Sequence, residues 1–206
     1  MNPNMRNQLT IIIPTHNRYD RLLRLLQYYA ASGCTAAVQV LDSSDDAPSK
    51  ELQAFITSHE AVAVARYPTE TEPLRKMLDG LQRVTTPYTV FWADDDFMVP
   101  WTLEEGVRML AAQSDISVVH GQSGLFHVNG GRIRWVDRYL QRSITDSTAS
   151  ARLQRHLARY SVMFYSLHRT EALRRNLNRV CEFNLDWHTW GEIALSSLAI
   201  IQGKAV

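Results

Sequence analysis

Three consecutive carboxylates, Asp94, Asp95 and Asp96, follow an apolar run at residues 88–93. Two like unit charges 4 Å apart repel by about 4 kcal/mol at an effective dielectric constant near 20. A bound cation removes this repulsion, and hard divalent ions such as Mg²⁺ and Mn²⁺ take oxygen ligands while leaving positions open for substrate phosphates. The triplet therefore predicts a divalent cation site, and a solvated acidic turn is the alternative interpretation.

Polar side chains follow two other apolar runs of the first half. Thr15 and Asn17 can hydrogen-bond a base or a ribose, and Arg18 can contact a phosphate. Asp42 can accept from a base N–H or a ribose hydroxyl, or it can form an Asx turn. Because ligands of open α/β sheets bind beyond the carboxyl ends of the strands, the three polar clusters together favour a nucleotide site over three separate turns.

The elements that must position these residues alternate along the first hundred residues. Apolar runs predict strands over 9–14, 37–41, 61–67 and 88–93, and helical spacing predicts helices over 19–31, 48–59 and 72–84. This alternation predicts an α/β fold with a mostly parallel central sheet and helices on both faces.

The pattern becomes less regular after the acidic triplet. We expect helices over 101–113, 148–161, 170–180 and 187–202, strands over 116–120 and 162–168, and a hairpin around Asn129-Gly130-Gly131. We interpret residues 1–206 as one domain, with a nucleotide-type half over 1–100 and a more irregular half over 101–206.

The composition is that of an ordinary globular protein. The formal net charge of +1 lacks the basic excess that nucleic-acid binding normally requires. Cys34 and Cys181 are too few for a disulfide framework, and the start of the chain has no apolar signal-peptide core. We expect a cytosolic protein without nucleic-acid partners, and peripheral attachment to the inner face of a membrane stays open.

Three segments together resemble the family 2 glycosyltransferases: residues 10–18 (TIIIPTHNR), 40–45 (VLDSSD) and 91–96 (FWADDD). The resemblance covers about the first hundred residues in the family's order and spacing. It implies a GT-A fold, a nucleoside-diphosphate sugar donor that is usually UDP-linked, and Mn²⁺ or Mg²⁺. It also implies that the loop from Pro14 to Arg18 and Asp42 hold the nucleoside. Asp94 and Asp96 would then act as the DXD pair at ribose and metal, with Asp95 secondary.

An inverting transfer also needs a general base for the acceptor hydroxyl. In the family this base is an Asp or Glu of the second half, and Asp186 is our first candidate with Glu192 second. The family's usual Glu-Asp pair is absent here. Lys76 and Arg75 can approach the diphosphate or form a solvated helix face, and Trp187 and Trp190 can stack on a sugar or anchor the core.

Further residues bear on the acceptor, for which the family implies a hydroxyl on a glycan, a growing polysaccharide or a lipid-linked sugar. His120 and Trp135 can line its site, although core or surface positions are the commoner alternative. Arg152, Arg155 and Arg159 share one predicted helix face that can dock an anionic acceptor or an anionic membrane, or simply be solvated.

Other proteins with a similar sheet place their functional residues differently. A sugar-phosphate nucleotidyltransferase would normally carry a glycine-rich loop after the first strand, and none is present. A receiver domain or haloacid-type phosphatase would place its aspartates where this chain has Thr15. A catalytically inactive glycosyltransferase-like binding or scaffold protein remains the alternative from a different class.

Overall fold

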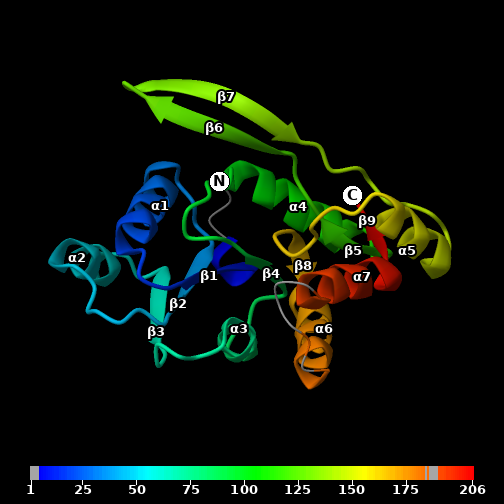
Figure 1. Cartoon of the computed structure of the whole chain (residues 1–206), viewed down its shortest axis with the longest axis horizontal. Coiled ribbons are helices and arrows are strands. Elements are labelled where there is room, and N and C mark those ends of the chain that lie inside the picture. Colours follow the sequence, from blue (N-terminus) through cyan, green and yellow to red (C-terminus); the bar gives the residue numbers. More distant parts are fainter. Residues whose placement is uncertain (1–4, 184, 186–189) are drawn as a thin grey trace.

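The first half of the chain alternates strands and helices, as the computed structural model of residues 5–183, 185 and 190–206 shows (Figure 1). A short 3-10 turn, η1 (Met5–Asn7), precedes them. The elements are β1 (Leu9–Thr15), α1 (Tyr19–Ala31), β2 (Ala37–Asp42), α2 (Lys50–Ser58), β3 (Val62–Arg66), α3 (Pro73–Gln82) and β4 (Tyr88–Phe91). The predicted alternation is confirmed, with ends that differ by a few residues.

The second half supplies further helices, the rest of the central sheet and a separate hairpin. Its elements are α4 (Pro100–Ala112), β5 (Ile116–Val119), β6 (Ser123–Asn129), β7 (Arg132–Tyr139), α5 (Ala149–Ala158), β8 (Leu167–Arg169), α6 (Thr170–Glu182), α7 (Glu192–Gln202) and β9 (Lys204–Ala205).

The central sheet of the described chain has seven strands in the order β3-β2-β1-β4-β8-β5-β9. The strands β1 to β4 run parallel, whereas β8 is antiparallel to both of its neighbours. Thr15 and Asp42 are direct partners in the register of β1 and β2. Since β1 lies between β2 and β4, the three polar clusters follow the carboxyl ends of neighbouring strands.

Apolar side chains of β1 leave the sheet alternately toward its two faces, as the two-residue period of a strand requires. Ile11 and Ile13 pack into a cluster with buried leucines of α1, α2 and α4. Ile12 packs on the other face with Phe91 and the apolar sides of α3, α6 and α7. Helices therefore cover both faces and hold the strand ends in fixed positions.

Several predicted elements of the second half differ from those observed. The strand expected over 162–168 is limited to Leu167–Arg169, because the preceding residues form a turn that packs Met163 and Phe164 into the core. The last α-helix spans Glu192–Gln202, and the start expected at residue 187 lies outside the described residues. The two-residue strand β9 was missed because such a short pairing has no sequence period.

The hairpin of β6 and β7 lies apart from the central sheet and arches over α1 and α4 (Figure 1). Its contact with the rest of the molecule includes Phe126, whose ring lies 6.4 Å from that of Phe97, whereas Trp135 is 69% exposed. Among the described residues, no helix has the length and apolarity needed to cross a membrane.

Candidate active site

The ends of β1 and β4 meet through a buried hydrogen bond. Thr15 Oγ1 donates to Asp94 Oδ2 over 2.7 Å, and the two residues are 2% and 3% exposed. Asp94 follows β4 by three residues, so the parallel pairing of β1 with β4 brings the two side chains together. Asp94, the first aspartate of the triplet, is thus a buried hydrogen-bond acceptor that is held in a fixed position.

Asp42 accepts hydrogen bonds from three surrounding groups. Ser44 N donates over 2.9 Å, the Tyr19 hydroxyl over 2.8 Å and Arg66 over 2.5 Å. Burial by itself would raise the pKa of Asp42, but these hydrogen bonds outweigh burial and hold the pKa below its usual value. The carboxylate is therefore charged and rigidly oriented at neutral pH.

Sequence reasoning missed Tyr19 and Arg66, although both had a signal. Tyr19 begins the helix that follows the first polar loop, and Arg66 ends β3, where it is the register partner of Asp42. The pKa of Arg66 is raised, chiefly by its hydrogen bond to Asp42. Arg66 and Asp42 end neighbouring strands, and a basic residue and an acidic residue in such positions could have indicated this ion pair.

The loop after β1 is tied to the loop after β2. Asn17 has a φ of 55°, its backbone N–H donates to Ser44 Oγ over 2.8 Å, and its side-chain amide donates to Asp45 Oδ2 over 2.6 Å. Asparagine tolerates this left-handed conformation better than most residues. Pro14, within β1, pairs with Leu41 in register. The two loops therefore form one rim, and Asn17 fixes the rim through its contacts with the protein.

Lys76 is buried beneath the strand ends. Its ammonium donates to the carbonyl oxygen of Thr15 over 3.0 Å and to Ser43 Oγ over 2.7 Å. Burial lowers the pKa of Lys76, and the charges of Asp42 and Asp94 oppose that shift. The solvated-face interpretation is therefore wrong for Lys76, which supports the loop backbone from below. Arg75 does lie on the solvated side of α3, where it pairs with Glu72.

Two arginines neutralise part of the acidic triplet. Arg18 lies 3.2 Å from Asp94 and 3.3 Å from Asp95, and Arg21 lies 2.8 Å from Asp95. The pKa of Arg18 is raised, mainly by its hydrogen bond to Asp94. The side chain of Arg18 is about half exposed, so it has room to turn toward an incoming phosphate.

Asp96 differs from its two neighbours because it is exposed and pairs with no basic side chain in the described part of the chain. The surrounding protein nevertheless displaces part of the water around its carboxyl, and this desolvation, together with the charges of Asp95 and Asp94, raises the pKa of Asp96. A cation would relieve this unfavourable potential, so the residues fit a metal whose remaining ligands come from a substrate. The described residues contain no cluster of three or more His, Cys, Asp or Glu side chains able to hold a metal by themselves.

Two aromatic side chains, Trp92 and Tyr165, pack against each other beside the acidic triplet. Trp92 Nε1 donates to the backbone oxygen of Asp96 over 3.1 Å, and the ring of Trp92 packs edge-on against Tyr165 at 6.1 Å. Burial raises the pKa of Tyr165, and the charges of Glu192 and the triplet add to the shift. Glu192 accepts a hydrogen bond of 2.9 Å from Tyr160. The second base candidate thus belongs to the same electrostatic region as the triplet.

The other residues singled out from the sequence lie in varied surroundings. Asp186 and Trp187 lie outside the described residues. Trp190 is 59% exposed and is no core anchor. His120 is partly buried, and burial lowers its pKa.

Arg152 contradicts the helix face on which the sequence placed it. Its guanidinium is buried and donates to the carbonyl oxygens of Ile200 and Ile201 at the end of α7. His156, one turn further on, is also buried, whereas Leu157 is exposed. The face of α5 toward the core is thus the one that carries Arg152, because a guanidinium can satisfy the free carbonyls of a neighbouring helix end.

The mixed but mainly parallel sheet, with polar side chains at neighbouring strand ends and an acidic triplet beyond β4, has the architecture of the GT-A fold. The family model described as "Glycosyl transferase family 2" matches residues 10–177. The chain belongs to this family, which confirms the resemblance found in the sequence. No curated protein matches the chain.

Solved structures support the fold assignment. A crystal structure of S. aureus TarS 1-349 superimposes with a TM-score of 0.62 at 15% identity, over 97% of this chain and 58% of that one. A second crystal structure of S. aureus TarS gives 0.64 at 17% identity, over 97% and 35% respectively. A structure of TarS 1-349 in complex with UDP-GlcNAc gives 0.61 at 15% identity, over 97% and 56%. The present chain therefore spans less than two thirds of the length of these neighbours.

Proposed function

We propose that this protein transfers a sugar from a nucleoside-diphosphate sugar, most simply a UDP-sugar, to an acceptor hydroxyl, with inversion at the anomeric carbon and a divalent cation as cofactor. The observation that carries the proposal is the convergence of Thr15, Asp42 and Asp94 at adjacent strand ends, next to the exposed Asp96. Membership of glycosyl transferase family 2 supports the reaction class, and the UDP-GlcNAc complex of a structural neighbour supports a UDP-linked donor.

Each strand end has a distinct part in binding the donor. The charged, fixed carboxylate of Asp42 would accept from the N–H of the base, and Asp94 would accept from a ribose hydroxyl. Arg18, which now neutralises Asp94 and Asp95, would pair with the diphosphate, since guanidinium groups bind phosphate oxygens in a bidentate manner. The loop from Pro14 to Asn17 would form the wall beside the base, and Lys76 would hold that loop from beneath.

Asp96 would hold the cation, with the donor's phosphate oxygens completing the coordination, as Mg²⁺ and Mn²⁺ sites often combine one or two carboxylates with substrate phosphates. When bound, such a cation neutralises the charge that develops on a leaving diphosphate.

The acceptor side needs a base and a path to the anomeric carbon. Glu192 would take the proton of the acceptor hydroxyl while that oxygen forms the new bond to the anomeric carbon. The bond from this carbon to the diphosphate breaks, and the electron pair leaves with the phosphate oxygen. One displacement with one base inverts the configuration. The hydrogen bond from Tyr160 orients the Glu192 carboxylate, and Asp186 stays the other candidate for this role.

We further propose that the acceptor belongs to a glycan, a polysaccharide or a glycolipid, and that the reaction takes place in the cytosol or at the inner face of a membrane. Exposed aromatic and basic side chains of the β6–β7 hairpin, including Trp135, support a surface that contacts such a membrane.

A thermal-shift panel tests the donor site. Nucleoside diphosphates and their sugars are added with and without Mn²⁺, because a ligand at 100 times its Kd stabilises the native state by about 2.7 kcal/mol. We expect one nucleotide to raise the melting temperature in a Mn²⁺-dependent manner, and the D96N variant to lose the Mn²⁺ dependence but keep the melting temperature of the free protein. Absence of a shift with every nucleotide would favour the inactive scaffold instead.

A further inference from the structure

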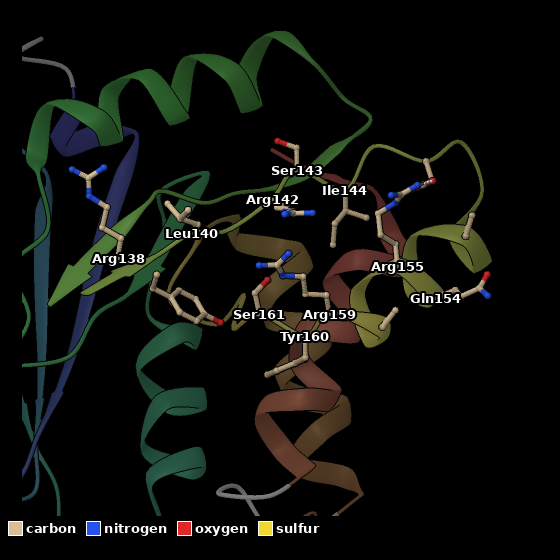
Figure 2. A pocket seen from close by; sticks show the side chains of 14 residues that line it. Arg138, Leu140, Arg142, Ser143, Ile144, Gln154, Arg155, Arg159, Tyr160 and Ser161 are labelled. Carbon is tan, nitrogen blue, oxygen red and sulfur yellow. Dashed lines mark hydrogen bonds and ion pairs between the residues drawn. The ribbon is translucent and has the colours of Figure 1, made fainter. Parts of the chain in front are cut away.

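We propose that the cleft between the end of β7 and helix α5 is an acceptor subsite that binds a phosphate group. The inference deepens the proposed function, on which it rests, by assigning the acceptor a phosphate next to the hydroxyl that receives the sugar. The cleft has a volume of about 710 Å³ and lies between the segment 138–146 and residues 151–161 (Figure 2). A cavity of this size accommodates a sugar phosphate or a short stretch of polymer.

The charge of this cleft selects for an anion. Arg138, Arg142, Arg155 and Arg159 line it, and Asp146 is the acidic residue among its lining side chains. Asp146 is already neutralised, because Arg155 contacts both of its carboxylate oxygens, over 2.6 and 2.7 Å. Three arginines therefore remain without an ion-pair partner among the described residues, in a protein whose formal net charge is only +1.

Two of these side chains are directed toward the same space although they come from different segments of the chain. Figure 2 shows Arg142, from the loop after β7, and Arg159, at the end of α5, pointing into the cleft from opposite sides. Two guanidinium groups that converge without an acid between them are favourable only when an anion or solvent separates them. Phosphate suits such a pair of arginines, because two parallel N–H groups of one guanidinium can donate to two oxygens of one phosphate.

Helix α5, which carries Arg155 and ends just before Arg159, is fixed to the core. Arg152 anchors α5 through its hydrogen bonds to the end of α7, and Thr148 caps the start of α5 by accepting from Ala151 N. A bound phosphate would thus meet Arg159 beside a helix whose position is already set, which reduces the ordering cost of binding.

One residue that lines the cleft contacts the candidate base. Tyr160 lines the cleft, and its hydroxyl donates to Glu192. An acceptor whose phosphate lies between Arg142 and Arg159 would therefore place a neighbouring hydroxyl group toward Glu192. The contact of Tyr160 with Glu192 distinguishes an acceptor subsite from a general basic surface. It links the arginine cleft to the group that would take the proton of the acceptor hydroxyl.

Calorimetric titration with inorganic pyrophosphate and with glucose 1-phosphate tests the subsite. EDTA is present, so that no metal contributes to phosphate binding, and glucose is the neutral control. We expect both phosphates to bind the wild-type protein, and the R142Q/R159Q variant to lose at least tenfold in affinity, equivalent to about 1.4 kcal/mol. The R175Q/R179Q variant removes the same charge from exposed positions of α6 and should bind like wild type.

Two results would overturn the inference. Equal phosphate affinity in R142Q/R159Q and R175Q/R179Q would mean that the cleft is not the site, and absence of phosphate binding to the wild type would mean the same. Vesicles of phosphatidylglycerol form a separate arm: binding to vesicles without binding of soluble phosphates would favour a membrane-docking surface instead. The donor panel described above is measured on the same wild-type protein, so failure of the proposed function is seen independently.

Discussion

Replacing Thr15 by valine tests whether the buried Thr15–Asp94 contact organises the donor site. Valine keeps the volume of threonine but leaves Asp94 Oδ2 without its 2.7 Å donor. Hydrogen bonds to charged groups contribute about 1.5–3 kcal/mol, and Asp94 keeps the Arg18 contact on its other oxygen. We therefore expect T15V to lower the free energy of unfolding by about 2 kcal/mol in a urea titration. We also expect it to weaken binding of the cognate nucleotide by about tenfold, equivalent to 1.4 kcal/mol.

The matched control is T10V, on the same strand. Thr10 is also buried, but its hydroxyl meets the neutral hydroxyl of Thr86 over 2.8 Å near the amino end of β1, away from the carboxyl ends that form the site. Loss of a neutral hydrogen bond should cost about 1 kcal/mol and leave nucleotide affinity unchanged. The reasoning is refuted if T15V is as stable as wild type, or if the two variants weaken nucleotide binding equally.

Three further predictions concern the base, the core and a tight backbone contact. E192Q should lower kcat by at least about 100-fold, because it removes the candidate general base. Y160F, which removes the hydrogen bond to that base, should lower kcat by about two- to tenfold. Full activity of E192Q in a transfer assay would instead favour Asp186 as the base. Burial lowers the pKa of His168 to about 4 from an ordinary 6.5, so its protonation favours the unfolded chain and stability should fall as pH decreases from about 6.5 toward 4. The loss amounts to about 2 kcal/mol between pH 7 and 5, and H168Q should flatten this part of the pH profile of unfolding, whereas an unchanged slope would contradict the assignment. G203A should cost at least about 1 kcal/mol in urea unfolding, because an added Cβ would lie 2.7 Å from the carbonyl oxygen of Asp115. G121A should be neutral, because a Cβ there meets no atom of the described residues within 4 Å, and equal effects of the two variants would contradict the steric argument.

Local sequence carried enough information for the first half of the fold and for the place of the site. The apolar runs and helical spacing of residues 9–93 predicted every strand and helix observed there, because neighbouring residues decide which side of an element faces the core. The acidic triplet, Asp42 and the Thr15 loop were expected at one edge of a sheet, since parallel strands carry their carboxyl ends to the same edge. Family membership followed from the same residues and is confirmed by the match over residues 10–177.

Only the tertiary structure decided which side chains meet. The contact of Asp42 with Arg66 depends on the register of β2 with β3, and its contact with Tyr19 depends on the pairing of β1 with β2. The burial of Lys76 depends on how α3 packs against these strands. Arg152 has the same pattern in sequence as a solvated arginine, yet the end of α7 supplies carbonyl oxygens that hold it in the interior. The arginine cleft beside Tyr160 likewise exists because the loop after β7 folds back over α5. The sequence by itself therefore determines the spacing of apolar residues and the polarity of each element. The partner of a buried charge is fixed only when distant segments pack together. The physical reason is that a buried charge is stable wherever the fold provides an opposite charge or free carbonyl groups.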